Sequence, residues 1–263
     1  MMKDMKALQA GTSHELGQNF SKAFDVQFAT SEGKKEFVWG TSWGVSTRLV
    51  GALIMTHSDD KGLVLPPNLA PIQVVLIPIF NSEEEFKSVS EKIKFVGEKL
   101  KSKNISIKID DRKNHKPGWK FSEYELKGIP VRIVIGPKDL ENNTVEVARR
   151  DELSKEIIDV NQVDSLIPKL LEKIQINLFD KAKEFRKENS YHVKDYNEFK
   201  ETIKNKGGFI YAHWDGSKET ENLIKKETKA TIRCIPMDYD INPGECIVTG
   251  KKSKGLVVFG KAY

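Results

Sequence analysis

The feature of this sequence that most constrains its fold is a regular alternation of strand-like and helix-like segments after residue 71. Residues 72–80 form a β-rich and almost continuous apolar run, which is typical of a strand buried on both faces. Apolar residues then recur at three- and four-residue intervals on one helical face: Phe86, Val89, Ile93, Val96 and Leu100. An alternating strand pattern follows at 105–109. The succession predicts helices packed on a largely parallel sheet.

Further segments extend this α/β domain to about residue 178. Asn81 and Ser82 are good caps for the helix that follows them. We expect a second helix at 118–127, strands at 129–135 and 144–148, and a last helix at 163–174.

Changes in composition divide the chain into three expected domains of mixed α/β and α+β type. Residues 1–69 alternate glycine-rich turns with apolar segments, and the proline-rich stretch 62–71 ends them. The α/β domain takes residues 70–178. A lysine-rich helix at 181–188 leads into a small α+β module, so the third domain is 179–263. At 263 residues, the chain is long enough for two or three domains.

Composition favours a soluble globular protein. Apolar residues make up 38% of the chain and charged residues 31%, and no run reaches the roughly 18 to 20 apolar residues of a membrane helix. A net charge of +5 is compatible with a polyanionic partner but does not identify one. Cys234 and Cys246 lie in a lysine-rich setting without an export signal. We therefore expect reduced thiols in a cytoplasmic protein and no disulfide.

The N-terminal segment contains a strand, a glycine turn and a helix in succession. Residues 36–43 predict a strand that runs into Gly44, and Ser46 is placed to cap a helix at about 47–55. Arg48 lies in the first turn of that helix. We expect the opposite side of the helix to be buried through Leu49, Val50, Leu53 and Ile54. Such a turn brings backbone close to a ligand.

Short blocks of distinctive sequence follow one another from the N-terminus to the C-terminus. They lie at residues 8–20, 40–51, 61–67, 117–121, 125–137 and 230–236. In this order they resemble prolyl-tRNA synthetases of the archaeal and eukaryotic type. The resemblance implies the remnant of a class II catalytic domain with an antiparallel sheet, an anticodon-binding α/β domain with a mixed sheet, and a small α+β C-terminal domain. The first two class II motifs, for dimerisation and for the α-phosphate, are not found, so we expect a truncated synthetase.

The resemblance also implies ligand contacts in the N-terminal segment, although it assigns no catalytic residue. ATP is expected at Gln9, Thr12, Ser46 and Arg48. Proline is expected at His14, Trp43 and Gly44. A planar guanidinium is suited to stacking on adenine, the role that the resemblance implies for Arg48. Each residue also has a simpler interpretation: a helix cap for Ser46, a core aromatic residue for Trp43, a turn residue for His14 and a surface amide for Gln9.

A basic and aromatic segment of the α/β domain indicates contacts with tRNA. The candidates are Lys116, Trp119, Lys120 and Arg132. Aromatic rings can stack on unpaired bases, and basic side chains can contact phosphates. The alternative is that Trp119 and Phe121 pack the helix onto the sheet while the charged residues cover a solvated face. Arg149 and Arg150 are further candidates.

We expect the C-terminal module to contain no zinc. The family often holds zinc there with four cysteines, whereas this chain has two in all. Cys234 is predicted to be a buried strand thiol. A mixed site of His213, Asp215 and Cys246 is an alternative that nothing else in the sequence supports. The resemblance implies that the final residue, Tyr263, approaches the catalytic domain, and a frayed tail is the alternative.

The activity implied by the resemblance is that of a proline-tRNA ligase. Such an enzyme uses ATP, with Mg²⁺ at the triphosphate, to form prolyl-adenylate and then transfers proline to tRNA(Pro). The full-length enzyme is expected to be a homodimer. The protein mainly positions substrates and stabilises phosphate charge. The alternative is a non-catalytic tRNA-binding fragment that retains the anticodon-binding and C-terminal domains. A third interpretation, an unrelated α/β protein, requires the order of the blocks to be accidental.

Overall fold

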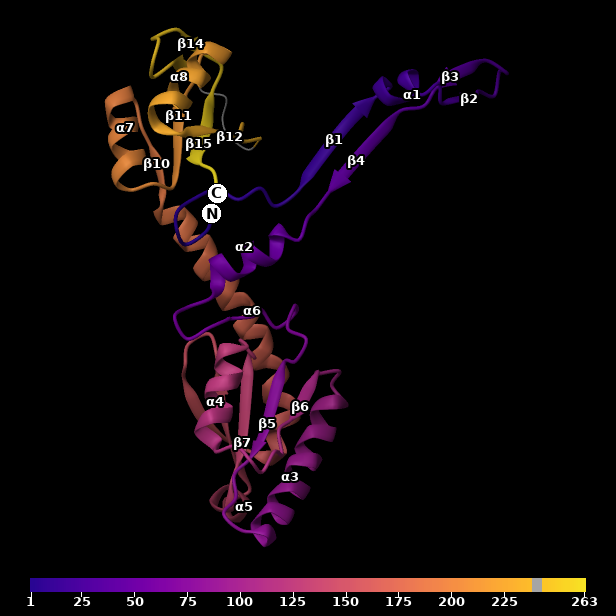
Figure 1. Ribbon diagram of the computed structural model, residues 1–263, viewed down its shortest axis with the longest axis vertical. Coiled ribbons are helices and arrows are strands. Elements are labelled where there is room, and N and C mark those ends of the chain that lie inside the picture. Colours follow the sequence, from indigo (N-terminus) through magenta and orange to yellow (C-terminus); the bar gives the residue numbers. More distant parts are fainter. Residues whose placement is uncertain (238–242) are drawn as a thin grey trace. The chain divides into compact units, whose positions relative to one another are not determined.

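The computed structural model describes residues 1–237 and 243–263 (Figure 1). Contacts divide the chain into two units. One unit is Leu53–Glu188, and the other combines Met1–Ala52 with Asn189–Tyr263. Each unit has its own core, and no helix of the described residues is both long and apolar enough to cross a membrane.

The unit Leu53–Glu188 is built on a mixed five-stranded sheet of order β6-β5-β7-β8-β9. The strands are β5 (Val74–Pro78), β6 (Ile107–Ile109), β7 (Val131–Ile135), β8 (Thr144–Arg149) and β9 (Lys155–Asp159). β5 is parallel to β6 and β7, whereas β8 is antiparallel to β7 and β9. The predicted strands are therefore present, but half of the pairings are antiparallel, because β7, β8 and β9 follow one another through short connections that reverse the chain.

Helices cover both faces of this sheet. They are α3 (Glu83–Lys101), α4 (Pro117–Leu126), α5 (Pro137–Asn142), a 3₁₀ turn (Val160–Gln162) and α6 (Val163–Glu188). α3 begins as predicted, since the Glu85 N–H donates to Ser82 Oγ at 3.2 Å. Apolar residues of α3 and α6 pack with Val74, Leu76 and Ile133 on one face. Tyr124 of α4 packs with Val75 and Ile77 on the other face.

α6 is longer than the sequence pattern predicted. The segments 163–174 and 181–188 belong to one helix of 26 residues, so the expected division at 178/179 falls inside it. The buried stripe of α6 continues to Leu178, which is 4% exposed, and the residues after it contain no proline or glycine that would end the helix.

The C-terminal part of the other unit is a small α+β domain. Its four-stranded sheet has the order β10-β11-β15-β12, in which only β10 and β11 are parallel. The elements are β10 (Ser190–His192), α7 (Tyr196–Asn205), β11 (Phe209–His213), α8 (Lys218–Thr228), β12 (Ala230–Cys234), β13 (Gly244–Glu245), β14 (Lys252–Ser253) and β15 (Leu256–Lys261). Phe199 of α7 packs edge-on against Phe259 of β15, with ring centroids 5.1 Å apart, at the centre of the core.

The prediction for Cys234 was wrong. Cys234 lies at the end of β12 but is exposed, whereas Cys246 is the buried thiol. The pairing of β12 with β15 is irregular between Ile232 and Cys234, so the strand does not continue its inward and outward alternation to the cysteine.

The N-terminal segment forms a ribbon rather than a wide sheet. β1 (Thr12–Gly17) pairs with β4 (Gly40–Gly44), and β2 (Gln27–Ala29) pairs with β3 (Lys35–Phe37), both antiparallel. A short helix, α1 (Asn19–Ala23), follows β1. The expected strand 36–43 is divided at residues 38–39, which lie between β3 and β4.

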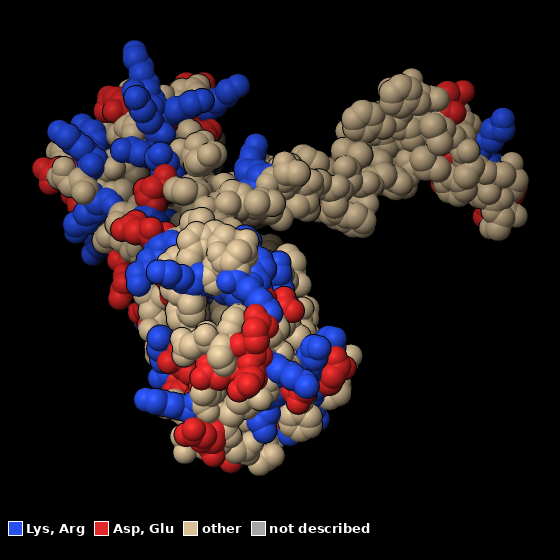
Figure 2. Space-filling view, turned by 60° about the horizontal axis from the view of Figure 1, so that its bottom comes forward, with Lys and Arg blue, Asp and Glu red and all other residues tan. Residues whose placement is uncertain are grey.

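The expected burial of the next helix, α2 (Arg48–His57), is also wrong. α2 contains no buried residue, and Leu49, Val50 and Ile54 are exposed. A two-stranded ribbon offers too little surface to cover an apolar helical face. Figure 2 shows few charged side chains over the ribbon, in agreement with the exposed Phe24, Trp39 and Trp43.

The two ends of the chain lie side by side in one unit. The Ala7 N–H donates to the Lys261 carbonyl at 2.9 Å, and the Tyr263 N–H donates to the Ala7 carbonyl at 3.0 Å. These bonds extend β15 along the N-terminal segment, two residues before Gln9. The backbone of Tyr263 is therefore held, although the residue as a whole is 74% exposed.

Candidate functional site

A shallow pocket of about 250 Å³ lies between the start of β1 and the turn before α2. All four residues predicted to contact ATP line it, together with Gly44: Gln9, Thr12, Ser46 and Arg48. The Gln9 Nε2 donates to Thr12 Oγ1 at 2.9 Å, and Thr12 stands opposite Gly44 in the β1–β4 ladder. The Arg48 N–H donates to Ser46 Oγ at 3.4 Å, although α2 begins at Arg48 and Ser46 lies two residues before it.

The three residues predicted to contact proline do not share one face of the ribbon. His14 stands opposite Ser42, and Trp43 stands opposite Ser13. Since neighbouring residues of a strand point to opposite faces, His14 lies on the face of Thr12 and Gly44, whereas Trp43 lies on the other face. The ribbon therefore does not bring Trp43 to the face that carries His14 and Gly44.

Lys120, a predicted tRNA contact, is a buried structural residue. Its side chain is 2% exposed, and its Nζ donates to the Asp110 carbonyl at 3.0 Å and lies 3.7 Å from Asp110 Oδ1. The Arg112 Nε and one terminal nitrogen bind the same carboxylate at 2.8 Å each. Burial acts to raise the pKa of Asp110, but the hydrogen bonds from Arg112 outweigh it and hold that pKa well below its usual range. An RNA phosphate cannot reach Lys120.

Trp119 and Lys116, two further predicted tRNA contacts, lie at the surface at and directly before the start of α4. Lys116 is exposed at the start of α4, and Trp119 is 48% exposed. The Trp119 ring stacks on His115 with centroids 3.9 Å apart, and the Arg112 guanidinium lies 5.2 Å from the Trp119 centroid. A half-exposed aromatic ring beside cations is the arrangement on which unpaired bases stack.

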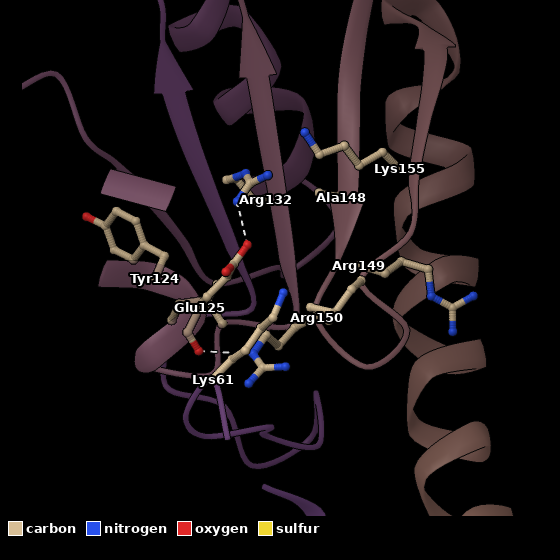
Figure 3. Close-up of a pocket in the computed structure, with 10 residues that line it drawn as sticks. Lys61, Tyr124, Glu125, Arg132, Ala148, Arg149, Arg150 and Lys155 are labelled. Carbon is tan, nitrogen blue, oxygen red and sulfur yellow. Dashed lines mark hydrogen bonds and ion pairs between the residues drawn. The ribbon is translucent and has the colours of Figure 1, made fainter. Parts of the chain in front are cut away.

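The fourth candidate, Arg132, lines a second pocket of about 210 Å³ (Figure 3). The Arg132 side chain is 8% exposed, and its guanidinium lies 3.9 Å from the Phe121 ring centroid and 3.4 Å from Glu125 Oε1. Its Nε is buried and has no hydrogen-bond partner among the described residues. Other lining residues are Lys61, Tyr124, Glu125, Ile129, Ala148, Arg149, Arg150, Leu153 and Lys155.

Arg149 and Arg150, the further candidates, also have structural partners. Arg149 binds both carboxylate oxygens of Asp151 at 3.0 and 2.7 Å. Arg150 binds both oxygens of Asp59 at 2.8 and 2.5 Å and donates to the Glu125 carbonyl at 3.0 Å. The sequence pattern did not single out Lys61, Glu125 or Lys155 as pocket residues. Lys61 and Glu125 are the first residues of the distinctive blocks 61–67 and 125–137, and this position was the sequence feature that could have indicated them.

In the C-terminal module, the residues of the alternative mixed metal site have other roles. Asp215 accepts hydrogen bonds from the Ser217 N–H and the hydroxyls of Ser217, Thr220 and Thr249, at 2.8 to 3.0 Å. His213 Nδ1 lies 3.2 Å from Ser253 Oγ. Among residues 1–237 and 243–263, no three or more histidine, cysteine or acidic side chains group so as to hold a metal ion. The zinc-free domain stays a prediction.

Comparisons with known proteins agree with this architecture. A model of the anticodon binding domain matches residues 73–170, and a model described as prolyl-tRNA synthetase, C-terminal, matches 196–263. Curated proteins named proline--tRNA ligase from Christiangramia forsetii and Flavobacterium psychrophilum are 59% and 60% identical over all of this chain. The chain spans about half the length of these curated relatives, 54% of each.

A solved structure is similar as well. It is the crystal structure of prolyl-tRNA synthetase from Cryptosporidium parvum complexed with L-proline and AMP. It has a TM-score of 0.91 and 40% identity, and the match covers 99% of this chain and 55% of that one.

The matched anticodon binding domain, together with the relatives named proline--tRNA ligase, identifies the class of protein as aminoacyl-tRNA synthetase. Since the matches to proline--tRNA ligases run along its whole length, the chain belongs to the prolyl-tRNA synthetase family, as its sequence blocks indicated.

Proposed function

We propose that this chain supplies the ATP-, proline- and tRNA-contacting residues of a proline-tRNA ligase. The observation that carries the proposal is the pocket that gathers Gln9, Thr12, Ser46 and Arg48 from two separate segments. Its backbone walls approach closely, since a Cβ on Gly11 would lie 3.4 Å from the Gly44 carbonyl oxygen. The structure from Cryptosporidium parvum is complexed with proline and AMP, which supports the same ligand classes here.

Each residue of the pocket has a distinct task in this proposal. Arg48 stacks its permanently charged guanidinium on the adenine ring. Gln9 and Thr12, already hydrogen-bonded to each other, offer an amide and a hydroxyl to the nucleotide. His14, on the same face of the ribbon, meets proline beside them. The chain thereby fixes the two substrates near each other, which is the main contribution of such enzymes.

Mg²⁺ accompanies ATP in this class of reaction, but the residues of the pocket do not suit it. Among the residues that the structure describes, no carboxylate lines the pocket, and hard cations prefer carboxylate oxygens.

The second candidate function is a tRNA-binding fragment without adenylation chemistry. The uncovered apolar face of α2 and the two-stranded ribbon favour it, because a site on an unsupported ribbon is held less firmly than one on a packed sheet. In both cases tRNA(Pro) is the proposed nucleic-acid partner, contacted through Lys116, Trp119 and Arg132. We further propose a homodimer for the complete enzyme and, because both cysteines are free, a cytoplasmic location.

Proline-dependent exchange of pyrophosphate into ATP separates the two functions. The purified chain is compared with Arg48→Ala, and with Lys103→Ala as a control at an exposed lysine outside the pocket. Exchange that Arg48→Ala abolishes and Lys103→Ala retains means that a usable adenylation site assembles from this chain. Absence of exchange, with tRNA(Pro) still bound in a gel shift, supports the binding fragment instead.

A further inference from the structure

One of the basic side chains that line the pocket of Figure 3 comes from a segment that precedes the sheet in the sequence. Arg132 comes from β7, Arg149 and Arg150 come from β8 and the turn after it, and Lys155 comes from β9. Lys61, by contrast, belongs to the loop between α2 and β5, before the segment matched as an anticodon binding domain. The pocket is therefore completed from outside that domain.

Specific contacts hold the loop of Lys61 in place. Arg150 binds the Asp59 carboxylate through two hydrogen bonds, and the Lys61 N–H donates to Asp59 Oδ1 at 2.9 Å. Gly62, with φ +132°, lies so close to α4 that a Cβ there would stand 2.5 Å from Leu126 Cα. The adjoining Leu63 N–H donates to the Leu126 carbonyl at 3.0 Å. The backbone that carries Lys61 is thus fixed at the edge of the pocket.

Charge pairing distinguishes Lys61 from the other cations of the pocket. The other four cations each have a carboxylate within ion-pair distance. Arg132 lies 3.4 Å from Glu125, and Arg149 lies 2.7 Å from Asp151. Arg150 lies 2.5 Å from Asp59, and Lys155 lies 3.2 Å from Glu146. In the part of the chain that the structure describes, no such partner stands beside the exposed Lys61 amino group. Lys61 is the pocket cation whose charge is not already neutralised.

We propose that Lys61 binds a backbone phosphate of RNA seated at this pocket. The inference rests on the proposed function, because it takes tRNA as the partner of the surrounding unit. A flexible ammonium group that has no carboxylate partner can bind a phosphate without first breaking an ion pair, and its binding releases a counterion condensed on the RNA. The unpartnered Arg132 Nε at the same pocket leaves a further donor unused. Lys61 therefore contributes affinity without reading sequence.

Salt-dependent RNA binding tests the proposal. An anticodon stem-loop of tRNA(Pro) and the same hairpin with a scrambled loop are titrated with the chain between about 50 and 200 mM salt. One phosphate contact lowers the slope of log affinity against log salt by about 1, which is roughly a threefold change across this range. We expect Lys61→Ala to show this loss equally for both hairpins. Lys61→Arg should retain the slope, and the exposed Lys103→Ala should leave it unchanged.

The outcomes separate the inference from the proposed function. Binding by the unsubstituted chain together with an unchanged slope for Lys61→Ala overturns the role of Lys61 alone. Failure of the unsubstituted chain to bind either hairpin overturns tRNA binding and this inference with it. If Lys61→Ala weakens binding of polyglutamate but not of RNA, the site is for an acidic protein and the inference is wrong. Equal thermal midpoints of the variants exclude an effect through folding.

Discussion

Lys116 and Lys120 lie one helical turn apart, yet they occupy opposite environments. Lys116 is exposed before the first turn of α4, whereas Lys120 points under the helix to Asp110 at the end of β6. Their residue type and spacing carry no sign of this difference. The partner of Lys120 comes from another element, ten positions away in the sequence, so its burial is a property of packing.

The two lysines should therefore respond differently to truncation. We expect Lys120→Ala to lower the free energy of unfolding by about 3 kcal/mol, because it leaves the buried Asp110 carboxylate without that partner. Lys116→Ala should change stability by less than about 0.5 kcal/mol and weaken RNA binding. Urea unfolding and a gel shift measure both effects. Equal stability of the two variants would contradict the burial of Lys120.

Asp215 ties the start of α8 to the loop that carries Thr249. Burial raises the pKa of Asp215, but the hydrogen bonds from Ser217, Thr249 and Thr220 outweigh it and lower the pKa from 3.8 to about 2. A carboxyl group whose pKa is lower in the folded state stabilises that state above its unfolded pKa. That stabilisation is lost as the pH falls through the folded value.

Acid should therefore remove the stability that the Asp215 carboxylate contributes to the folded state. We expect Asp215→Asn to lower the thermal midpoint of the C-terminal domain at pH 6, and the difference from the unsubstituted chain to shrink between about pH 4 and pH 2. Thermal unfolding followed by circular dichroism at several pH values measures this. Glu245→Gln, at an exposed position of β13, is the control. A difference that stays constant down to pH 2 would refute the role of the Asp215 carboxylate.

Among the elements, the loop before β5 shows how close backbone contact requires glycine. Gly62 packs against the backbone of Leu126, and Gly128 packs against the backbone of Leu63. A Cβ on Gly62 would stand 2.5 Å from Leu126 Cα, and one on Gly128 would stand 2.6 Å from the Leu63 carbonyl oxygen. Both have positive φ, which glycine adopts without strain. The loop thereby runs against the end of α4 and carries Lys61 to the pocket.

A single methyl group should loosen this contact. Gly62→Ala is expected to destabilise the unit by about 2 kcal/mol, because it adds a backbone clash to an unfavourable φ. Gly118 lies in α4, and nothing among the described residues is within 4 Å of the added Cβ, so Gly118→Ala should stabilise the unit by up to about 1 kcal/mol. Urea denaturation compares them. A neutral Gly62→Ala would show that the loop does not approach α4 this closely.

At the scale of the whole molecule, the two units have cores without a shared residue. Buried clusters of the sheet β6-β5-β7-β8-β9 come from residues 64–178, whereas that of the C-terminal sheet comes from residues 193–259. Cooperativity arises where residues bury one another, so each core is its own cooperative unit.

We therefore expect unfolding in two steps. Hydrogen exchange in increasing urea should show protection lost at different concentrations in α3 and β5 on one side and in α7 and β15 on the other. Within each unit, the loss should be simultaneous. One common transition for all four elements would contradict independent cores.

The sequence by itself determined the family and the strand and helix alternation of residues 72–148. It also singled out Gln9, Thr12, Ser46 and Arg48, which the structure brings to one pocket. Each of these depends on local pattern or on motifs in order. Tertiary structure alone decided the continuous α6, the burial of Lys120 and the exposure of Cys234 and α2, whereas a mixed sheet was already implied by the family resemblance. Tertiary structure also separated His14 from Trp43 and brought Lys61 to the arginine pocket. These outcomes depend on which segments, distant in the sequence, pack against a residue. The residues next to it in the sequence do not specify those contacts.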